Sequence, residues 1–199
     1  MKDTLVIAAF PATGKSYAFK NYNNDYIILD SDSSKFSWIE RKRTDEEIEE
    51  IRARYESEPH LMSWEGYYNQ IKNDLIKTRN PEFPNNYIQH IKENIGKVDF
   101  IFVSTHKQVL KAMEEAGIEF IIVYPERRLM HEYIGRCYCR PNNGFPIDIL
   151  IQNWDNWMND MEEFSEHHAY FKLSYGKHIS DYLDSIIKVE NIICSKKEE

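Results

Sequence analysis

The sequence predicts an α/β fold in which helices flank a parallel sheet. Short apolar runs rich in β-branched residues are typical of strands that are buried on both faces. Five such runs occur, at residues 4–10, 26–29, 100–104, 120–123 and 170–173. The segments between them carry helix start and stop signals, and such alternation is typical of parallel strands joined by right-handed crossovers.

The length and composition indicate one folded domain. A chain of 199 residues is within the range of a single hydrophobic core. Hydrophobic residues make up 42% of the chain and aromatic residues 14%, which excludes a disordered or fibrous protein. The apolar run Leu5 to Phe10 is far shorter than the roughly 18 residues of a membrane helix, and no cleavage site follows it. We therefore expect neither a membrane span nor an export signal.

Charge and cysteine content narrow the class of partner and the compartment. The net charge is −8, from 33 acidic and 25 basic residues, and it makes binding to nucleic acid or to an anionic membrane unlikely as a general property. The three cysteines, Cys137, Cys139 and Cys194, are too few and too irregularly spaced for a disulfide framework. We expect free thiols and a cytoplasmic protein.

Helix signals divide the chain between the strands. Thr44 and Glu47 form a capping box that opens a helix ending near Pro59. Further helices are expected at 61–78 and 85–95, so that a mostly helical insert, residues 31–97, separates the second and third strands.

Later helices are expected in the second half of the chain, at 107–116, 125–140, 147–164 and 179–187. The cluster Pro141 to Gly144 breaks the second of these, and we treat residues 125–143 as a helical lid. No linker or repeat is visible, so one domain is expected over residues 1–194, with a frayed tail at 195–199.

A phosphate-binding loop is expected directly after the first strand. Ala9 to Ser16 reads Ala-Phe-Pro-Ala-Thr-Gly-Lys-Ser and leads into a helix-compatible segment. In such a loop, backbone amides surround the β-phosphate, the lysine neutralises charge on the β- and γ-phosphates, and the serine is a ligand of Mg²⁺. The residues expected to bind the nucleotide here are Ala12, Thr13, Gly14, Lys15, Ser16 and Tyr17.

Two carboxylates follow the second strand. Asp30 and Asp32 come at its carboxyl end, beside the expected phosphate loop. We assign Asp30 to the Mg²⁺ side and Asp32 to the acceptor side, where a carboxylate orients or deprotonates a hydroxyl. The alternative is one capping and one solvated aspartate. The third strand ends in Ser104, Thr105 and His106 without an acidic residue, which gives the aspartate pair more weight.

Four arginines follow the fourth strand: Arg127, Arg128, Arg136 and Arg140. The last three share one helix face, which suits a lid that closes guanidinium groups onto a transferring phosphoryl group. A solvated basic face paired with Glu126 and Glu132 is the alternative reading.

These residues resemble the nucleoside monophosphate kinase and shikimate kinase group of small P-loop kinases. They are also similar to ATP-binding P-loop proteins of bacteriophages and bacteria. The resemblance covers the loop, the aspartate pair, the helical insert, the arginine lid and the closing segment 172–176. It implies a three-layer P-loop NTPase fold with a five-stranded parallel sheet in the order 2-3-1-4-5, and it places Gly176 near the adenine.

The expected function is therefore transfer of the γ-phosphoryl group of ATP, with Mg²⁺, to a small acceptor such as a nucleotide or nucleoside. The expected catalytic residues are Lys15, Asp32, Arg128 and Arg136, with Arg127 and Gly176 on the nucleotide and Ser16 and Asp30 on the metal. The sequence carries no acceptor signature of adenylate, guanylate or thymidylate kinases. A polynucleotide or modified-base kinase, and a nucleotide-binding switch or interaction protein without transferase activity, remain open as alternatives.

Overall fold

The computed structural model describes residues 4–22, 26–61, 63–72, 75–139 and 147–187. The chain divides into two compact units. The first combines the residues up to Ser33 with those from Pro84 onward, and the second is Ser34–Phe83. The second unit is shorter than the expected insert, because the helix at 85–94 buries Tyr87, Ile88 and Ile91 in the first unit.

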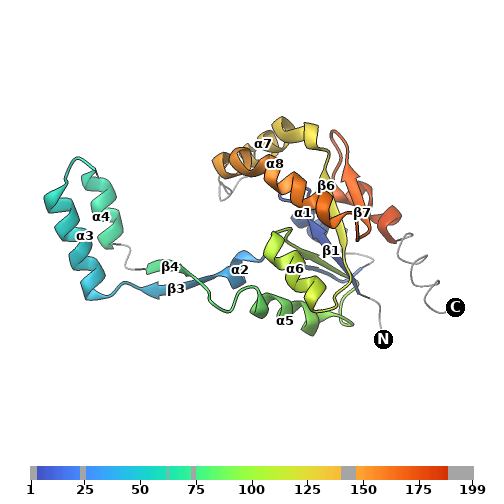
Figure 1. The fold of residues 1–199 in the computed structure, drawn as a ribbon, viewed down its shortest axis with the longest axis horizontal. Helices are drawn as coiled ribbons and strands as arrows, with labels where there is room; N and C mark the ends of the chain where they lie inside the picture. Colours follow the sequence, from blue (N-terminus) through green and yellow to red (C-terminus); the bar gives the residue numbers. More distant parts are fainter. Residues whose placement is uncertain (1–3, 23–25, 62, 73–74, 140–146, 188–199) are drawn as a thin grey trace. The chain divides into compact units, whose positions relative to one another are not determined.

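The first unit is built on a five-stranded parallel sheet in the order β2-β5-β1-β6-β7 (Figure 1). Its strands are β1 (Leu5–Ala9), β2 (Ile28–Asp30), β5 (Phe100–Val103), β6 (Ile121–Pro125) and β7 (Tyr170–Leu173). Counted within this unit, the order is 2-3-1-4-5, so the predicted fold class is confirmed. Because β1 is the central strand, the loop that follows it lies in the middle of the carboxyl edge.

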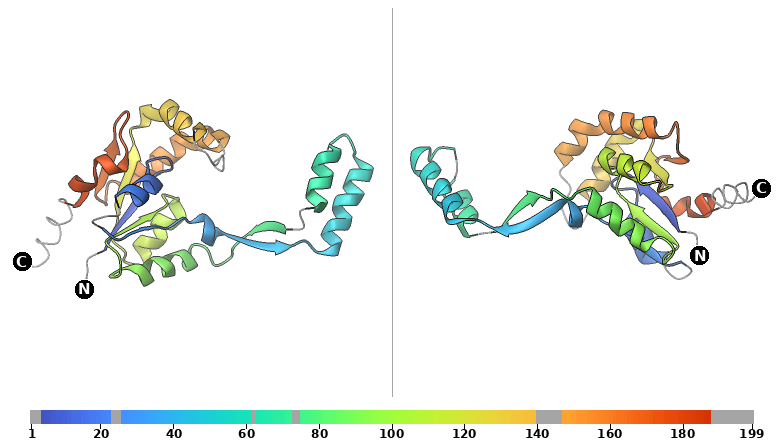
Figure 2. Two further views of the ribbon diagram at one scale, coloured as in Figure 1. Left: turned by 180° about the vertical axis from the view of Figure 1, so that it is seen from behind. Right: turned by 60° about the horizontal axis from the view of Figure 1, so that its bottom comes forward.

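Helices cover both faces of this sheet and complete three layers. They are α1 (Lys15–Asn21), α5 (Asn85–Asn94), α6 (Lys107–Glu115), α7 (Met130–Tyr138) and α8 (Ile147–Phe164), with 3-10 helices η1 (Arg127–Leu129) and η2 (Ile179–Asp181). The segments α1 and η2 lie on one face, and α5, α6 and α8 lie on the other (Figures 1 and 2). None of the helices in the described ranges is long and apolar enough to cross a membrane.

The predicted lid helix begins later than expected, and its first turn is a 3-10 helix. It starts as η1 and continues as α7 to Tyr138, whereas we expected one helix from Pro125. Its predicted end at Arg140 and the break at 141–144 lie outside the described residues, as does the tail at 195–199. The helix at 147–164 is confirmed.

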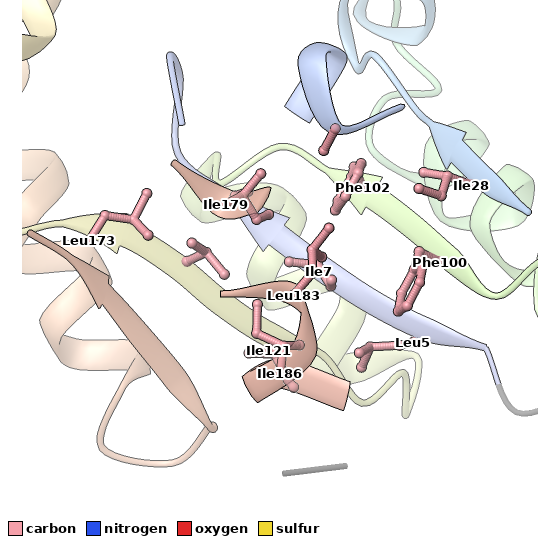
Figure 3. Close-up of a cluster of buried hydrophobic side chains, with 13 residues drawn as sticks. Leu5, Ile7, Ile28, Phe100, Phe102, Ile121, Leu173, Ile179, Leu183 and Ile186 are labelled. Atoms are coloured by element: carbon pink, nitrogen blue, oxygen red, sulfur yellow. The ribbon is translucent and has the colours of Figure 1, made fainter. Parts of the chain in front are cut away.

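One buried cluster joins the loop-bearing strand to the end of the chain. Ile7 of β1 packs beside Phe102 and Ile121 of the neighbouring strands (Figure 3). Ile179, Leu183 and Ile186 cover them from the segment after β7. This packing holds the segment around η2 against the same sheet face as α1, and therefore close to the loop between β1 and α1.

The second unit is a β-ribbon that carries two helices. Its elements are α2 (Ser34–Ser37), β3 (Trp38–Lys42), α3 (Asp45–Ser57), α4 (Trp64–Lys72) and β4 (Leu75–Arg79). Strands β3 and β4 pair antiparallel, with Trp38 opposite Arg79 and Lys42 opposite Leu75 (Figure 2). The predicted capping box of Thr44 and Glu47 is confirmed.

The prediction of a helix over 61–78 is confirmed at 64–72 and is wrong at 75–78. Residues 75–79 form a strand, whose exposed and half-buried side chains alternate along its length. Alternation with period two is the pattern of a strand. The five-residue segment is too short for that pattern to be distinguished without knowledge of the partner strand at 38–42.

Candidate functional site

Hydrogen bonds to the neighbouring strand and within the loop fix the start of the loop between β1 and α1. The Phe10 amide donates to the Val123 carbonyl at 2.9 Å, and the Thr13 hydroxyl donates to the Phe10 carbonyl at 2.7 Å. Two residues have left-handed backbone conformations, Ala12 with φ 62° and Gly14 with φ 96°. These turns bend the chain so that Gly14 becomes the N-cap of α1.

Gly14 is restricted by its backbone angle and by a neighbour. A Cβ atom at this position would lie 3.2 Å from the ring of His178. We expect Gly14→Ala to lower the free energy of unfolding by about 1–2 kcal/mol, the cost of a left-handed L-residue. Denaturant unfolding measures this change.

Gly135 provides the matched control for that substitution. It lies within α7, and a Cβ there would meet nothing within 4 Å. Gly135→Ala is therefore expected to stabilise the protein by about 0.5–1 kcal/mol through helix propensity. Equal effects at the two glycines would show that the loop conformation at Gly14 is not strained by a side chain.

The side chain of Lys15 folds back over the loop. Its ammonium donates to the carbonyl oxygens of Ala9 and Phe10, the latter at 3.2 Å. The first turn of α1 contains no acidic residue, and its N-cap has no capping side chain. Because the first amides of a helix have no acceptor within it, this end of α1 presents donors and a cation that fit a phosphate anion.

Ser16 and Asp30 meet at the carboxyl edge of the sheet. The Ser16 hydroxyl donates to the Asp30 carboxylate at 2.8 Å, so α1 and β2 bring together the two residues assigned to the metal. The described residues contain no group of three or more His, Cys, Asp or Glu that could hold a metal ion. A serine and a single carboxylate fit Mg²⁺, which typically keeps few protein ligands and completes its shell with phosphate oxygens and water.

Asp32 lies two residues beyond the end of β2 and is exposed. Two hydrogen bonds hold the backbone of the preceding residue, Ser31. Its amide donates to the Phe102 carbonyl at 2.9 Å, and its carbonyl accepts from the Tyr87 hydroxyl at 2.7 Å. Burial raises the pKa of Tyr87, and the charges of Asp32 and Asp30 raise it further. Both carboxylates therefore lie near this buried phenol, although only Asp30 contacts Ser16.

The end of β5 supplies polar groups next to β1. Val103 pairs with Ala8, so Ser104 and the residues after it follow at the same edge. The His106 ring nitrogen Nδ1 lies 3.1 Å from the Ser104 hydroxyl. No acidic residue follows β5 directly, which agrees with the assignment of the metal-side carboxylate to Asp30 on the next strand.

Arg136 connects α7 to the phosphate loop. Its guanidinium donates to the carbonyl oxygens of Ala12 at 3.2 Å and Lys177 at 2.7 Å, and it also forms an ion pair with Glu132. The same carboxylate accepts the Gly176 amide at 3.1 Å. Three segments distant in sequence therefore converge on this ion pair, and Gly176, with φ 73°, lies beside it.

The segment after β7 also contacts the loop directly. The Ile179 amide donates to the Thr13 carbonyl at 2.9 Å, and the ring of His178 packs against Gly14. Burial lowers the pKa of His178, and the nearby Arg136 cation lowers it further, whereas Asp181 and Glu132 oppose both effects.

This lowered pKa predicts a loss of stability in acid. The unfolded chain binds the His178 proton more readily than the folded protein, so the contribution of neutral His178 is present above the ordinary histidine pKa of about 6.5 and is lost as the pH falls below it. The drop in unfolding free energy between neutral pH and pH ~5 should be smaller in His178→Gln than in the wild type. Equal drops in the two proteins would contradict the assignment.

The other two arginines lie elsewhere. Arg127 donates to Asp155, Asn159 and Glu162 of α8 at 2.6–3.0 Å, and the carboxylates of Glu162 and Asp155 raise its pKa. Arg128 is exposed and pairs with Glu126 at 2.5 Å. Of the described lid arginines, the structure thus brings Arg136 to the loop, whereas Arg127 binds side chains of α8 and Arg128 binds Glu126. Arg140 lies outside the described residues.

The base of the lid packs on the loop through Phe10. Its ring makes edge contacts with Tyr133 of α7 and with Trp154 and Trp157 of α8, at centroid distances of 6.0, 5.6 and 6.0 Å.

Two nearby residues were expected to bind the nucleotide as well. Tyr17 is exposed on α1, and Thr13 is buried within the loop.

Sequence reasoning missed two participants and misjudged a third. Lys177 contributes a carbonyl to Arg136, and His178 packs on Gly14. Neither carries a local signal, because their roles depend on where the chain returns after β7. Glu132 was considered only as a surface partner of the arginines, although its spacing of four residues from Arg136 could have identified the pair.

No protein-family model matches the chain, and no curated protein matches it. Among solved structures, the crystal structure of TT1252 from Thermus thermophilus is similar, with 13% sequence identity and a TM-score of 0.40. The match covers 96% of this chain and 98% of that chain.

Proposed function

We propose that the protein is a Mg²⁺- and ATP-dependent phosphotransferase that acts on a small acceptor, in particular a nucleotide or nucleoside. The observation that carries the proposal is the junction of β1 and α1. There Gly14 caps the helix in a left-handed conformation, Lys15 folds over the loop, and Ser16 lies 2.8 Å from Asp30. This combination of turn, cation and oxygen ligands suits a nucleoside triphosphate with its magnesium ion.

Each residue has a role in the proposed reaction. The loop amides and Lys15 bind the β- and γ-phosphates, and Ser16 and Asp30 hold Mg²⁺. Magnesium, when bound, neutralises charge on the phosphate oxygens. Asp32 accepts the proton of the acceptor hydroxyl while the oxygen of that hydroxyl forms a bond to the γ-phosphorus. The bond between the γ-phosphorus and the bridging oxygen breaks at the same time, and ADP leaves.

Arg136 has a positioning role in this proposal. Its hydrogen bonds go to the loop carbonyl of Ala12 and to Lys177, and its side chain is only 13% exposed. A guanidinium that is satisfied in this way fixes the loop and the segment after β7 relative to α7. Arg128 is 74% exposed and remains the arginine proposed to reach the transferring group.

The test follows label from γ-labelled ATP with Mg²⁺ into a panel of nucleosides, nucleoside monophosphates, small hydroxyl compounds and oligonucleotides. We expect transfer to one class of acceptor by the wild type, and loss of transfer in Asp32→Asn with ATP binding retained. Lys20→Ala, an exposed lysine on the same helix, is the control and should transfer normally. ATP binding without any labelled acceptor, oligonucleotides included, would contradict the transferase and favour a nucleotide-dependent switch.

A further inference from the structure

The second unit has two parts of opposite charge. The ribbon, defined as residues 38–43 and 75–79, holds five basic residues and one acidic residue, for a net charge of +4. The tip, defined as residues 44–72, holds eight acidic and three basic residues, for a net charge of −5. Opposite charges of similar size therefore follow one another along a single compact unit.

Both parts also expose apolar side chains. The ribbon exposes Trp38, Ile39 and Leu75, and the tip exposes Leu61, Trp64 and Tyr68. Neither α3 nor α4 buries any residue fully. Clustered exposed aromatic and aliphatic groups on a small unit are typical of an interaction surface.

Contacts within the tip leave this surface open. Tyr55 of α3 stacks on Tyr67 of α4 with ring centroids 4.3 Å apart, and Trp64 lies 5.4 Å from Tyr67. The acidic residues Glu50 and Glu56 of α3 are exposed. Helical geometry places them on the two flanks of the face that holds Ile51 and Tyr55, about 120° from its centre, so neither charge points into the packed seam.

Contacts within the second unit engage part of the ribbon's charge. Lys77 pairs with Glu40 at 3.2 Å, which compensates the acidic residue of the ribbon. Arg41 binds Glu47 of the tip through two hydrogen bonds of 2.6 and 2.7 Å, which fixes the ribbon end to α3. Exposed pairs of this kind contribute little to stability, so little free energy opposes their replacement by contacts with a partner.

We propose that this unit binds a second copy of itself, with the tip of each copy against the ribbon of the other. A partner of a single charge sign would be attracted to one of the two parts, ribbon or tip, and repelled by the other. A second copy carries both signs, and a twofold axis makes both contacts at once. A five-residue strand spans about 17 Å and α3 about 20 Å, so the two parts match in length.

The experiment measures the mass of the full-length chain by sedimentation at about 100 μM, above the micromolar dissociation constants of weak specific complexes. We expect a dimer in low salt that weakens as the salt rises from about 0.05 M to about 0.5 M. The ribbon variant Lys42→Glu/Lys77→Glu and the tip variant Glu50→Lys/Glu56→Lys should each dimerise on the order of 100-fold more weakly, because each removes most or all of the net charge of the part that it changes, ribbon or tip.

A mixture of the two variants gives the decisive result. Each variant alone presents two parts of more similar charge, but the unchanged tip of the ribbon variant still complements the unchanged ribbon of the tip variant. An equimolar mixture should therefore form a heterodimer, which also shows that both variants are folded. The control Lys97→Glu/Glu166→Lys, which reverses two exposed charges in the first unit, should dimerise as the wild type does.

Three results would overturn the proposal. A monomeric wild type would assign the charged surfaces to a partner of another sequence. A dimer unaffected by both reversals would place the interface elsewhere, and a mixture that stays monomeric would exclude pairing of tip with ribbon.

Discussion

Lys15→Ala is expected to lower the rate of phosphoryl transfer by a factor of about 100 to 1,000, or about 2.7–4 kcal/mol in activation free energy, as for removal of one preorganised donor at a charged transition state. Lys15 is the cation of the loop, and its ammonium lies over the Ala9 and Phe10 carbonyls. The measurement is the single-turnover rate at saturating ATP.

Lys20→Ala controls for the loss of positive charge from α1, since Lys20 is exposed in the last turn of that helix. Its rate should stay close to that of the wild type. Turnover of Lys15→Ala at the wild-type rate would rule out the loop as the phosphate site.

Arg136→Met is expected to lower the free energy of unfolding by about 3 kcal/mol, because it leaves the carboxylate of Glu132 buried without its cation. The two side chains are only 13% and 15% exposed, so water screens the pair weakly. Denaturant unfolding with a fixed m-value measures the loss.

Two further variants separate this effect from a simple loss of charge. Arg128→Met removes an arginine that is 74% exposed, and its effect should stay within about 0.5 kcal/mol. The double variant Arg136→Met/Glu132→Leu should be more stable than Arg136→Met alone, since no unpaired charge remains. If Arg136→Met costs no more than Arg128→Met, the ion pair does not hold the three segments together.

Local patterns in the sequence predicted the fold and the centre of the site. The strand, turn and helix around Gly14 are specified by neighbouring residues, and the strand order was expected from the resemblance to small P-loop kinases. Ser16 and Asp30 meet because Asp30 ends β2 and Ser16 lies in the first turn of the helix that follows β1 and its loop. Such features need no knowledge of distant contacts.

Contacts between distant segments could not be predicted in the same way. The alternating pattern of β4 has meaning only against β3, which lies more than thirty residues earlier in the chain. Arg127 was expected at the nucleotide, but Asp155, Asn159 and Glu162 follow one another on one face of α8 and bind it. The spacing of these three residues on one helix face is visible in the sequence, whereas the orientation of that face toward Arg127 depends on how α8 packs.

The packing of Phe10 gives the protein an internal optical reporter. Of its four tryptophans, Trp154 and Trp157 contact this loop residue, and Trp38 and Trp64 belong to the second unit. A ligand that moves the loop backbone changes the surroundings of two indole rings at once. With Trp38 and Trp64 replaced by phenylalanine, the fluorescence that remains would follow nucleotide binding in real time, without any attached dye.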